Sequence, residues 1–384
     1  MSQQQPPKPE HKDWERSAKV HHVIESTIRT KLNISENTKY LDTRNNIENL
    51  IIKWTNFNLN DPLKSGPAFP VGINRNAIVA HDSSYYGDKR TFKQGDLINI
   101  DYGIHFKGAI YDSAFSLSIP YDEEKISKDY NKDLIKISED AVNNTISNMS
   151  GEMCINDIGA ITSEFIQSKE INHLINTDVA TRYINGHVVD TEKLIPVKNI
   201  TDICGHLIRP YKVHGGIPIP NGTISGLPNE FRLKNNHYYA IEIFPSSGSG
   251  ETIELNTQSK ITKYIDINNN NDSSNNDDSG DNVIRTTHYM FNYMDRKFSK
   301  NVALWMQQDK NEALKNNIIK ISKQRLSMAF TPEWLYFDNN DINQLLDRDI
   351  IKSYPPIADK NPFCKTAQTE KTIYVSPDNK IHIL

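Results

Sequence analysis

Two runs of apolar positions near the N-terminus advance in steps of three and four residues. The first consists of Trp14, Ala18, His21, Ile24, Ile28 and Leu32, and the second of Ile47, Leu50, Ile51 and Trp54. Such steps place side chains on one face of a helix, so the pattern predicts a pair of amphipathic helices. Residues 1–12 are polar and Pro-containing, and we expect a disordered tail there.

The spacing changes at residues 97–119, where two strand-like runs flank Lys107 and Gly108. Apolar runs on both sides of a short Gly-containing turn indicate a β-hairpin. The later segments are helical at 123–150 and 153–170, strand-like at 196–265, helical at 311–329 and 341–351, and strand-like at 371–376. Helices, strands, helices and strands in this order predict an α+β fold.

A low-complexity run from Asn268 to Gly280 consists of Asn, Asp, Ser and Gly. Such a segment has no apolar side chains to bury, so we expect a solvated loop insertion at about 266–282. The run lacks the D-x-[DN]-x-[DN]-G pattern followed by Glu that binds calcium in EF-hands. We therefore expect the loop to be inert.

Charge and composition exclude several classes of protein. The chain has 44 Lys and Arg against 48 Asp and Glu, for a net charge of −4, which provides no basic surface for nucleic acid or an anionic membrane. No apolar run approaches the ~18–20 residues of a membrane span, and the N-terminus has no secretory apolar segment. The three widely spaced cysteines fit neither a disulfide framework nor a thiolate zinc site. We therefore expect a cytoplasmic protein.

Two aspartates in the expected hairpin are the first candidates for chemistry. If the chain turns about Phe106 and Lys107, Asp101 and Asp112 lie directly opposite one another within otherwise apolar strands. Two buried carboxylates that face each other either share a proton or bind a cation. A turn shifted by one residue would instead place them on opposite faces of the hairpin.

Further carboxylates and imidazoles occur in strand-like segments. Glu242 lies within the apolar run YYAIEIF, Glu370 precedes the last strand, and His206 and His214 flank the segment HLIRPYKVH. Four carboxylates with one imidazole form an oxygen-rich set, which favours a dinuclear Mn, Co, Fe or Zn site over a structural zinc. The H-E-x-x-H signature of mononuclear metalloproteases is absent, and so are complete nucleotide-binding Gly motifs.

These residues lie in segments that resemble the type 2 methionine aminopeptidase family. The matching segments, in chain order, are AFPVGINRNAIVAH, INIDYGIHFKGAIYDSAFS, GHLIRPYKVHGG, YYAIEIF and TAQTEKTIYV. The resemblance runs from about residue 14 to the C-terminus. It implies a single catalytic domain over residues 13–384 with the pita-bread fold, a curved antiparallel sheet covered by two helix pairs. It also implies a type 2 helical insertion at about 291–353.

The resemblance assigns roles to particular side chains. It implies that two divalent cations, Co, Mn, Fe or Zn, are bound by Asp101, Asp112, His206, Glu242 and Glu370. It implies catalytic roles for Glu242 as the base and for His81 and His214 as groups that contact the scissile amide. The family's pocket for the methionine side chain falls on Phe69, Val213, His288, Ala329 and Tyr354.

The implied activity is removal of the initiator methionine from nascent polypeptides whose second residue is small and uncharged, by attack of a metal-activated hydroxide. The expected partners are nascent N-termini, with transient proximity to ribosomes but no direct contact with nucleic acid or membrane, and we expect a monomer. Two alternatives stay open. One is a non-catalytic pita-bread protein that binds ribosomes or RNA, and the other is an Xaa-Pro aminopeptidase or prolidase-like enzyme with the same metal site.

Overall fold

The computed structural model describes residues 6–120, 131–174, 183–184, 187–188, 192–228, 230–257, 260–261, 264, 284–291, 328–335 and 337–384. Its helices are α1 (His11–Lys31), α2 (Tyr40–Thr55), α3 (Asn131–Ser147), α4 (Ile155–Gln167) and α8 (Asn339–Asp347), with the 3-10 helix η1 (Pro332–Leu335). Its strands are β1 (Ser65–Pro67), β2 (Gly72–Arg75), β3 (Ile78–Ala80), β4 (Leu97–Phe106), β5 (Ala109–Ser118), β6 (Glu170–Leu174), β7 (Tyr183–Ile184), β8 (His187–Val188), β9 (Glu192–Pro196), β10 (Lys198–Asn199), β11 (Gly205–Ile208), β12 (Pro218–Ile219), β13 (His237–Ile243), β14 (Pro245–Ser246), β15 (Thr252–Glu254), β16 (His288–Phe291), β17 (Ile351–Tyr354), β18 (Ile357–Asp359), β19 (Thr369–Val375) and β20 (Ile381–Ile383).

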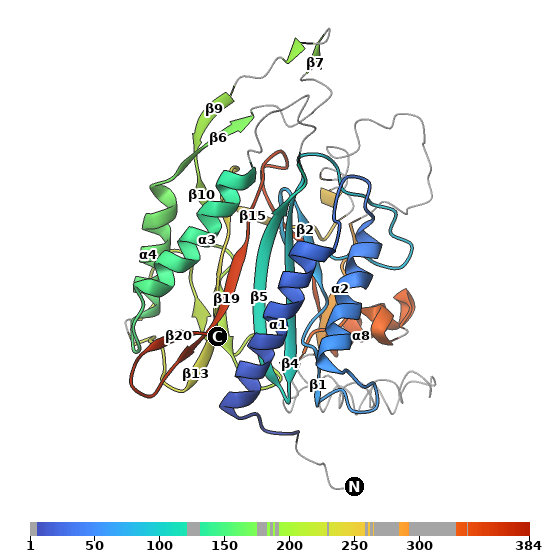
Figure 1. The fold of residues 1–384 in the computed structure, drawn as a ribbon, viewed down its shortest axis with the longest axis vertical. Coiled ribbons are helices and arrows are strands. Elements are labelled where there is room, and N and C mark those ends of the chain that lie inside the picture. The colour runs from blue at the N-terminus through green and yellow to red at the C-terminus, as the bar shows by residue number, and fades with distance from the viewer. Residues whose placement is uncertain are drawn as a thin grey trace.

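Two antiparallel sheets form the centre of the fold and meet where β5 and β19 lie side by side (Figure 1). In the first, β4 pairs with β1, β2 and β5, and the second has the order β12-β11-β13-β19-β20. Side-chain hydroxyls link the two sheets. Ser113 Oγ donates to the carbonyl of Glu370 at 2.7 Å, and Thr372 Oγ1 donates to the carbonyl of Asp112 at 2.7 Å. These bonds hold two prospective metal ligands at the junction of the sheets.

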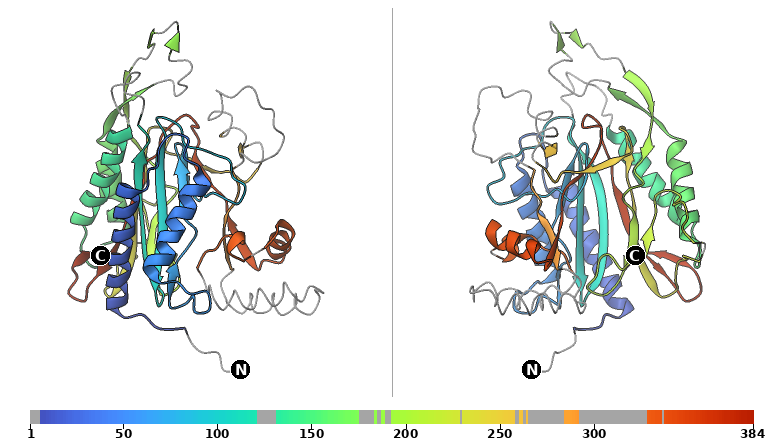
Figure 2. Two further views of the ribbon diagram at one scale, coloured as in Figure 1. Left: turned by 45° about the vertical axis from the view of Figure 1, so that its right-hand side comes forward. Right: turned by 180° about the vertical axis from the view of Figure 1, so that it is seen from behind.

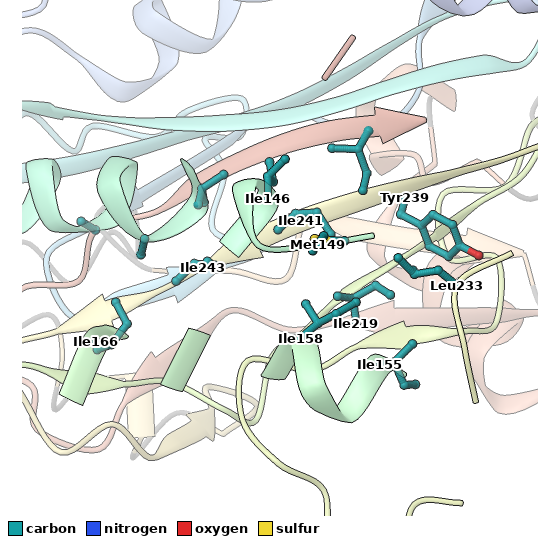
Figure 3. Packing of buried hydrophobic residues seen from close by; sticks show 14 of the residues in the cluster. Ile146, Met149, Ile155, Ile158, Ile166, Ile219, Leu233, Tyr239, Ile241 and Ile243 are labelled. Atoms are coloured by element: carbon teal, nitrogen blue, oxygen red, sulfur yellow. The ribbon is translucent and has the colours of Figure 1, made fainter. Parts of the chain in front are cut away.

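Two helix pairs cover the strands (Figures 1 and 2). Helix α1 packs on β4 and β5 with α2 beside it, and its buried face contains Trp14, Ala18, His21, Ile24 and Ile28. Helix α3 packs on β13 and β19 with α4 beside it. Figure 3 shows the second of these interfaces, where isoleucines of both helices meet the strands. The first predicted helix therefore buries most of the face that its spacing indicated, whereas in the second Ile47 and Ile51 are buried and Trp54 is exposed.

A smaller lobe lies beside the central strands and has a hydrophobic cluster of its own. We define the insertion lobe as the described residues 284–291, 328–335 and 337–354. In it, β16 pairs with β17, and Phe330 exchanges two backbone hydrogen bonds with Tyr289. Its cluster includes Phe291, Phe330, Leu345 and Ile351. The expected helical insertion thus contains α8 and η1, but its edges at β16 and β17 are strands.

Several sequence-based boundaries need correction. Helix α1 begins at His11, so the predicted tail of residues 1–12 is two residues too long. The helix predicted at 341–351 is α8, which ends at Asp347. Of the helix predicted at 311–329, only residues 328 and 329 are described, and neither is helical. Residues 266–282 and 292–327 lie outside the described part of the chain.

The hairpin register also differs from the prediction. The turn is Lys107-Gly108, with φ of 50° and 85°, and both positive values match a tight two-residue hairpin turn. Asp101 therefore pairs with Ala114, and Asp112 with Gly103. The predicted register was wrong by two residues. Because side chains alternate with a period of two, the aspartates nevertheless lie on one face, as diagonal neighbours.

The architecture is the α+β pita-bread fold that the sequence predicted: a curved antiparallel sheet with two covering helix pairs. Within the described residues, no helix has the length and apolar character needed to cross a bilayer.

Candidate metal centre

A cavity of about 290 Å³ opens between the central strands and the insertion lobe. All twelve predicted site residues line it: Phe69, His81, Asp101, Asp112, His206, Val213, His214, Glu242, His288, Ala329, Tyr354 and Glu370. They come from positions 69 to 370 of the chain. The fold therefore brings the predicted metal ligands, histidines and pocket residues to one place.

The strand registers explain why the carboxylates converge. Glu242 of β13 lies directly opposite Glu370 of β19, so their side chains project from the same face. Asp112 of β5 reaches that position because β5 and β19 are adjacent, and His206 of β11 lies across from Ala240. Asp101 of β4 lies opposite Gly72. The pairing thus supplies one ligand from each of five neighbouring strands.

The donor atoms lie within metal-binding reach of one another. One donor atom each from Asp112, His206 and Glu370 lies within 4.8 Å of the other two. His206 Nε2 is 3.6 Å from Asp112 Oδ2 and 4.0 Å from Glu242 Oε1. Among the described atoms, the buried Asp101 Oδ1 has no hydrogen-bond partner, while Gln368 Nε2 donates to Asp101 Oδ2 at 3.2 Å. An unpaired carboxylate oxygen beside an oxygen-rich donor set fits divalent cations.

The electrostatics of the cluster also favour a cation. Burial raises the pKa of Asp101 to about 6. Burial, followed by repulsion from the neighbouring carboxylates, raises the pKa of Asp112, Glu242 and Glu370 well above their ordinary values. Four ionised carboxylates in one buried cluster destabilise each other, and a divalent cation offsets that repulsion.

His81 and His214 lie on the edge of this cluster. His81 has a left-handed backbone with φ of 65°, which is uncommon for a residue with a side chain, and its Nδ1 lies 3.3 Å from the carbonyl of Pro355. Burial, followed by the charge of His214, lowers the pKa of His81 to about 4. Desolvation, followed by the charge of Lys212, lowers the pKa of His214. Both rings are therefore neutral near pH 7, and a neutral imidazole carries one N–H that can donate.

The apolar part of the cavity adjoins the histidines. The Tyr354 ring lies 5.6 Å from the His81 ring and 6.3 Å from the His214 ring, measured between centroids. His288 Nε2 lies 3.2 Å from the carbonyl of Pro70, which fixes the imidazole against the wall. Phe69 packs over Gly103, where any Cβ would overlap its ring. The pocket residues therefore form one wall of the cavity, with their rings fixed by these contacts, next to the predicted metal ligands.

Sequence reasoning missed several residues of the site. Gln368 contacts Asp101 and lies two positions before Glu370, so strand alternation was an available signal. Cys204 also lines the cavity, and burial, together with the charge of Glu242, raises its pKa to about 11. The other residues missed are Gly72, Ala80, Asp202, Ile203, Met290 and Ile357. No local pattern marked these.

Comparison with known proteins places this geometry in context. The chain is 25% identical over 370 residues to methionine aminopeptidase 2 of Yarrowia lipolytica, covering 96% of this chain and 65% of that protein. It is 27% identical to the Debaryomyces hansenii methionine aminopeptidase 2 and 26% identical to that of Saccharomyces cerevisiae, covering 96% of this chain and 72% and 73% of those proteins. The chain therefore spans about two thirds to three quarters of these relatives.

Solved structures share the fold at low identity. The structure of a thermophilic Arx1 matches with a TM-score of 0.67 and 11% identity, over 97% of this chain and 89% of that one. A methionine aminopeptidase from Thermotoga maritima matches with a TM-score of 0.54 and 13% identity, over 99% and 98%. At these identities the likeness establishes the fold.

The family relationship rests on the sequence itself. The sequence pattern of metallopeptidase family M24 matches residues 15–266, about two thirds of the chain, including four of the five converging ligands. Membership of this family implies the use of divalent metal, in agreement with the carboxylate and imidazole cluster. The chain belongs to metallopeptidase family M24.

Proposed function

We propose that this protein is a methionyl aminopeptidase, which removes the initiator methionine from polypeptides whose second residue is small and uncharged. The observation that carries the proposal is the convergence, in one cavity, of the complete predicted ligand set, His81, His214 and an apolar wall. The similarity to fungal methionine aminopeptidase 2 over 96% of the chain supports the same activity.

The residues that would hold the metal are Asp101, Asp112, His206, Glu242 and Glu370. When bound, two divalent cations, Co, Mn, Fe or Zn, supply Lewis acidity toward the scissile carbonyl and lower the pKa of a water molecule. Cation charge also lowers the pKa of the surrounding carboxyls, so that they are ionised at neutral pH. This reverses the effect of burial and makes Glu242 available as a base.

The chain's own groups would then move the protons and hold the substrate. Glu242 would take a proton from the attacking water and pass it to the leaving amine. Neutral His214 would donate a hydrogen bond to the carbonyl oxygen as negative charge develops there, and His81 would contact the nitrogen of the scissile amide. Phe69, with the wall around Tyr354, would take the unbranched side chain of methionine.

The test is cleavage of Met-Ala-Ser by metal-stripped protein after each cation is added back singly, followed by mass spectrometry. We expect loss of one N-terminal methionine, no cleavage of an Xaa-Pro peptide, and binding of divalent metal by elemental analysis. Asp112→Asn should abolish turnover while the protein stays folded. Cleavage of Xaa-Pro peptides alone would favour a prolidase-like enzyme, and metal binding without any turnover would favour a non-catalytic binding protein.

The expected partners and location form part of the same proposal. A methionyl aminopeptidase acts on nascent N-termini, which are available in the cytoplasm close to ribosomes. Sedimentation of cell extracts through sucrose, with this protein detected across the gradient, would test ribosome proximity. Light scattering of the purified protein would test the monomer.

A further inference from the structure

Arg44 of α2 contacts two segments that both supply residues to the lining of the cavity. Its side chain is buried, with 8% exposed, and donates from Nη1 to the carbonyl of Ser84 at 2.6 Å. Its Nη2 lies 2.7 Å from Glu333 Oε2. Ser84 belongs to the loop that follows His81, and Glu333 belongs to the insertion lobe. One guanidinium therefore joins the two segments.

Glu333 makes a second connection between the same segments. Its Oε1 accepts a hydrogen bond from the backbone N–H of Tyr86, two residues beyond Ser84. The next residue, Trp334, donates from Nε1 to Glu48 Oε1 on α2 at 3.3 Å. We call Arg44, Ser84, Tyr86 and Glu333 the Arg44 clamp. Within the clamp, charge-assisted bonds connect a helix, the His81 loop and the insertion lobe.

Each end of the clamp leads directly to a cavity residue. His81 lies three residues before Ser84, and its left-handed backbone is of a kind that persists only where surrounding contacts hold it. Ala329 lies four residues before Glu333, and its neighbour Phe330 is bonded to Tyr289, next to His288. A change in the clamp would therefore move a histidine on one side and the pocket wall on the other.

We propose that Arg44 and Glu333 are positioning residues that fix how the insertion lobe docks against the His81 loop, and with it the fit of the substrate's first side chain. A guanidinium is rigid and planar. Hydrogen bonds from it to two different segments therefore hold those segments together and also fix their relative position. The kinetic consequences rest on the proposed aminopeptidase activity.

The first variant is Glu333→Gln, because the Glu333 side chain is 28% exposed and glutamine keeps its size. The carboxamide still accepts from Tyr86 but no longer pairs with the charge of Arg44. We expect KM for Met-Ala-Ser to rise about 10-fold, since a looser pocket loses binding in ground and transition states alike, and kcat to fall by a smaller factor because His81 shifts with its loop.

A second variant separates charge from geometry. Arg44→Lys keeps the positive charge but lacks the fork that reaches Ser84 and Glu333 together, so KM should again rise. The matched control is Glu25→Gln, which removes the carboxylate from an Arg–Glu pair of 2.8 Å on α1 and should leave KM and kcat unchanged. Unchanged KM in both clamp variants, or a loss confined to kcat, would overturn the proposal.

Hydrogen exchange on the metal-loaded protein gives a readout that does not depend on activity. In Glu333→Gln, the amides of 82–86 and 328–335 should exchange faster together, while those of β13 and β19 stay protected. If wild-type protein cleaved no peptide but this paired change appeared, the clamp would stand and the proposed function would fail. If the protein cleaved Met-Ala-Ser but the two segments exchanged as before, the clamp would be wrong and the function would remain.

Discussion

Replacing one carboxylate of the metal centre should change how the stability of metal-free protein depends on pH. Burial raises the pKa of Asp101 from 3.8 to about 6. Between these values the folded protein binds a proton at Asp101 that the unfolded chain releases. The contribution of the Asp101 carboxyl to the free energy of unfolding is therefore fully present below about pH 4, and it is lost as the pH rises through about 6.

The size of the effect follows from the two pKa values. Their difference of about 2 corresponds to about 3 kcal/mol in the free energy of unfolding, at about 1.4 kcal/mol for each pKa unit. The variant Asp101→Asn cannot titrate, yet its side-chain carbonyl can still accept the hydrogen bond from Gln368. The substitution thus removes the titration and keeps the neighbouring contact.

The assay is urea unfolding of metal-stripped protein at pH 4 and at pH 7. From pH 4 to pH 7, wild type should lose about 3 kcal/mol more unfolding free energy than Asp101→Asn does. Asp140→Asn, which alters an exposed ion pair on α3, should behave as wild type. If wild type and Asp101→Asn instead changed in parallel, burial would not raise the pKa of Asp101, and this part of the electrostatic argument for a cation would fail.

Three further predictions concern the cavity and the loop. His81→Ala should lower kcat for Met-Ala-Ser by about 10²–10⁴ if this side chain assists the leaving group, and unchanged steady-state kinetics would remove it from the mechanism. Gly103→Ala forces the Phe69 ring to move, so KM should rise about 10-fold, whereas an unaltered KM in a folded variant would place Phe69 outside the pocket. Deletion of 268–280 should leave kcat/KM near normal, and a large loss would show that the loop takes part.

Local spacing predicted the covering helices because each buried face comes from one segment. Trp14 and Ile24 are 3% and 0% exposed in α1, where they meet the strands. Trp54 follows the same spacing in α2 but remains 42% exposed. Spacing identifies which face of a helix is apolar. How much of that face is covered depends on strands formed by residues elsewhere in the chain.

The two aspartates predicted to bind metal converge with the other candidates even though the predicted hairpin register was wrong. The predicted pairing of Asp101 with Asp112 was off by two residues, and a shift of two keeps every side chain on its face. A shift of one would have separated the two aspartates. The type of turn decided this: the positive φ of both Lys107 and Gly108 fixes a two-residue loop, and a lysine at the first position gives a weak sequence signal for it.

The two sides of the cavity have different physical origins, and this limits what a sequence reveals about substrate choice. The predicted metal ligands project from adjacent strands of the central layer and lie within short motifs, so the family resemblance of those motifs was enough to assign them. The apolar wall includes residues of a lobe that joins α2 through Arg44 and Glu333, which are 289 positions apart and belong to no shared pattern. If the proposed clamp is right, substitutions at that junction would alter the fit of a side chain while all five predicted ligands stay in place. The ligand set therefore predicts metal binding, whereas in the proposed aminopeptidase the selection of the first residue would depend on how the lobe is docked.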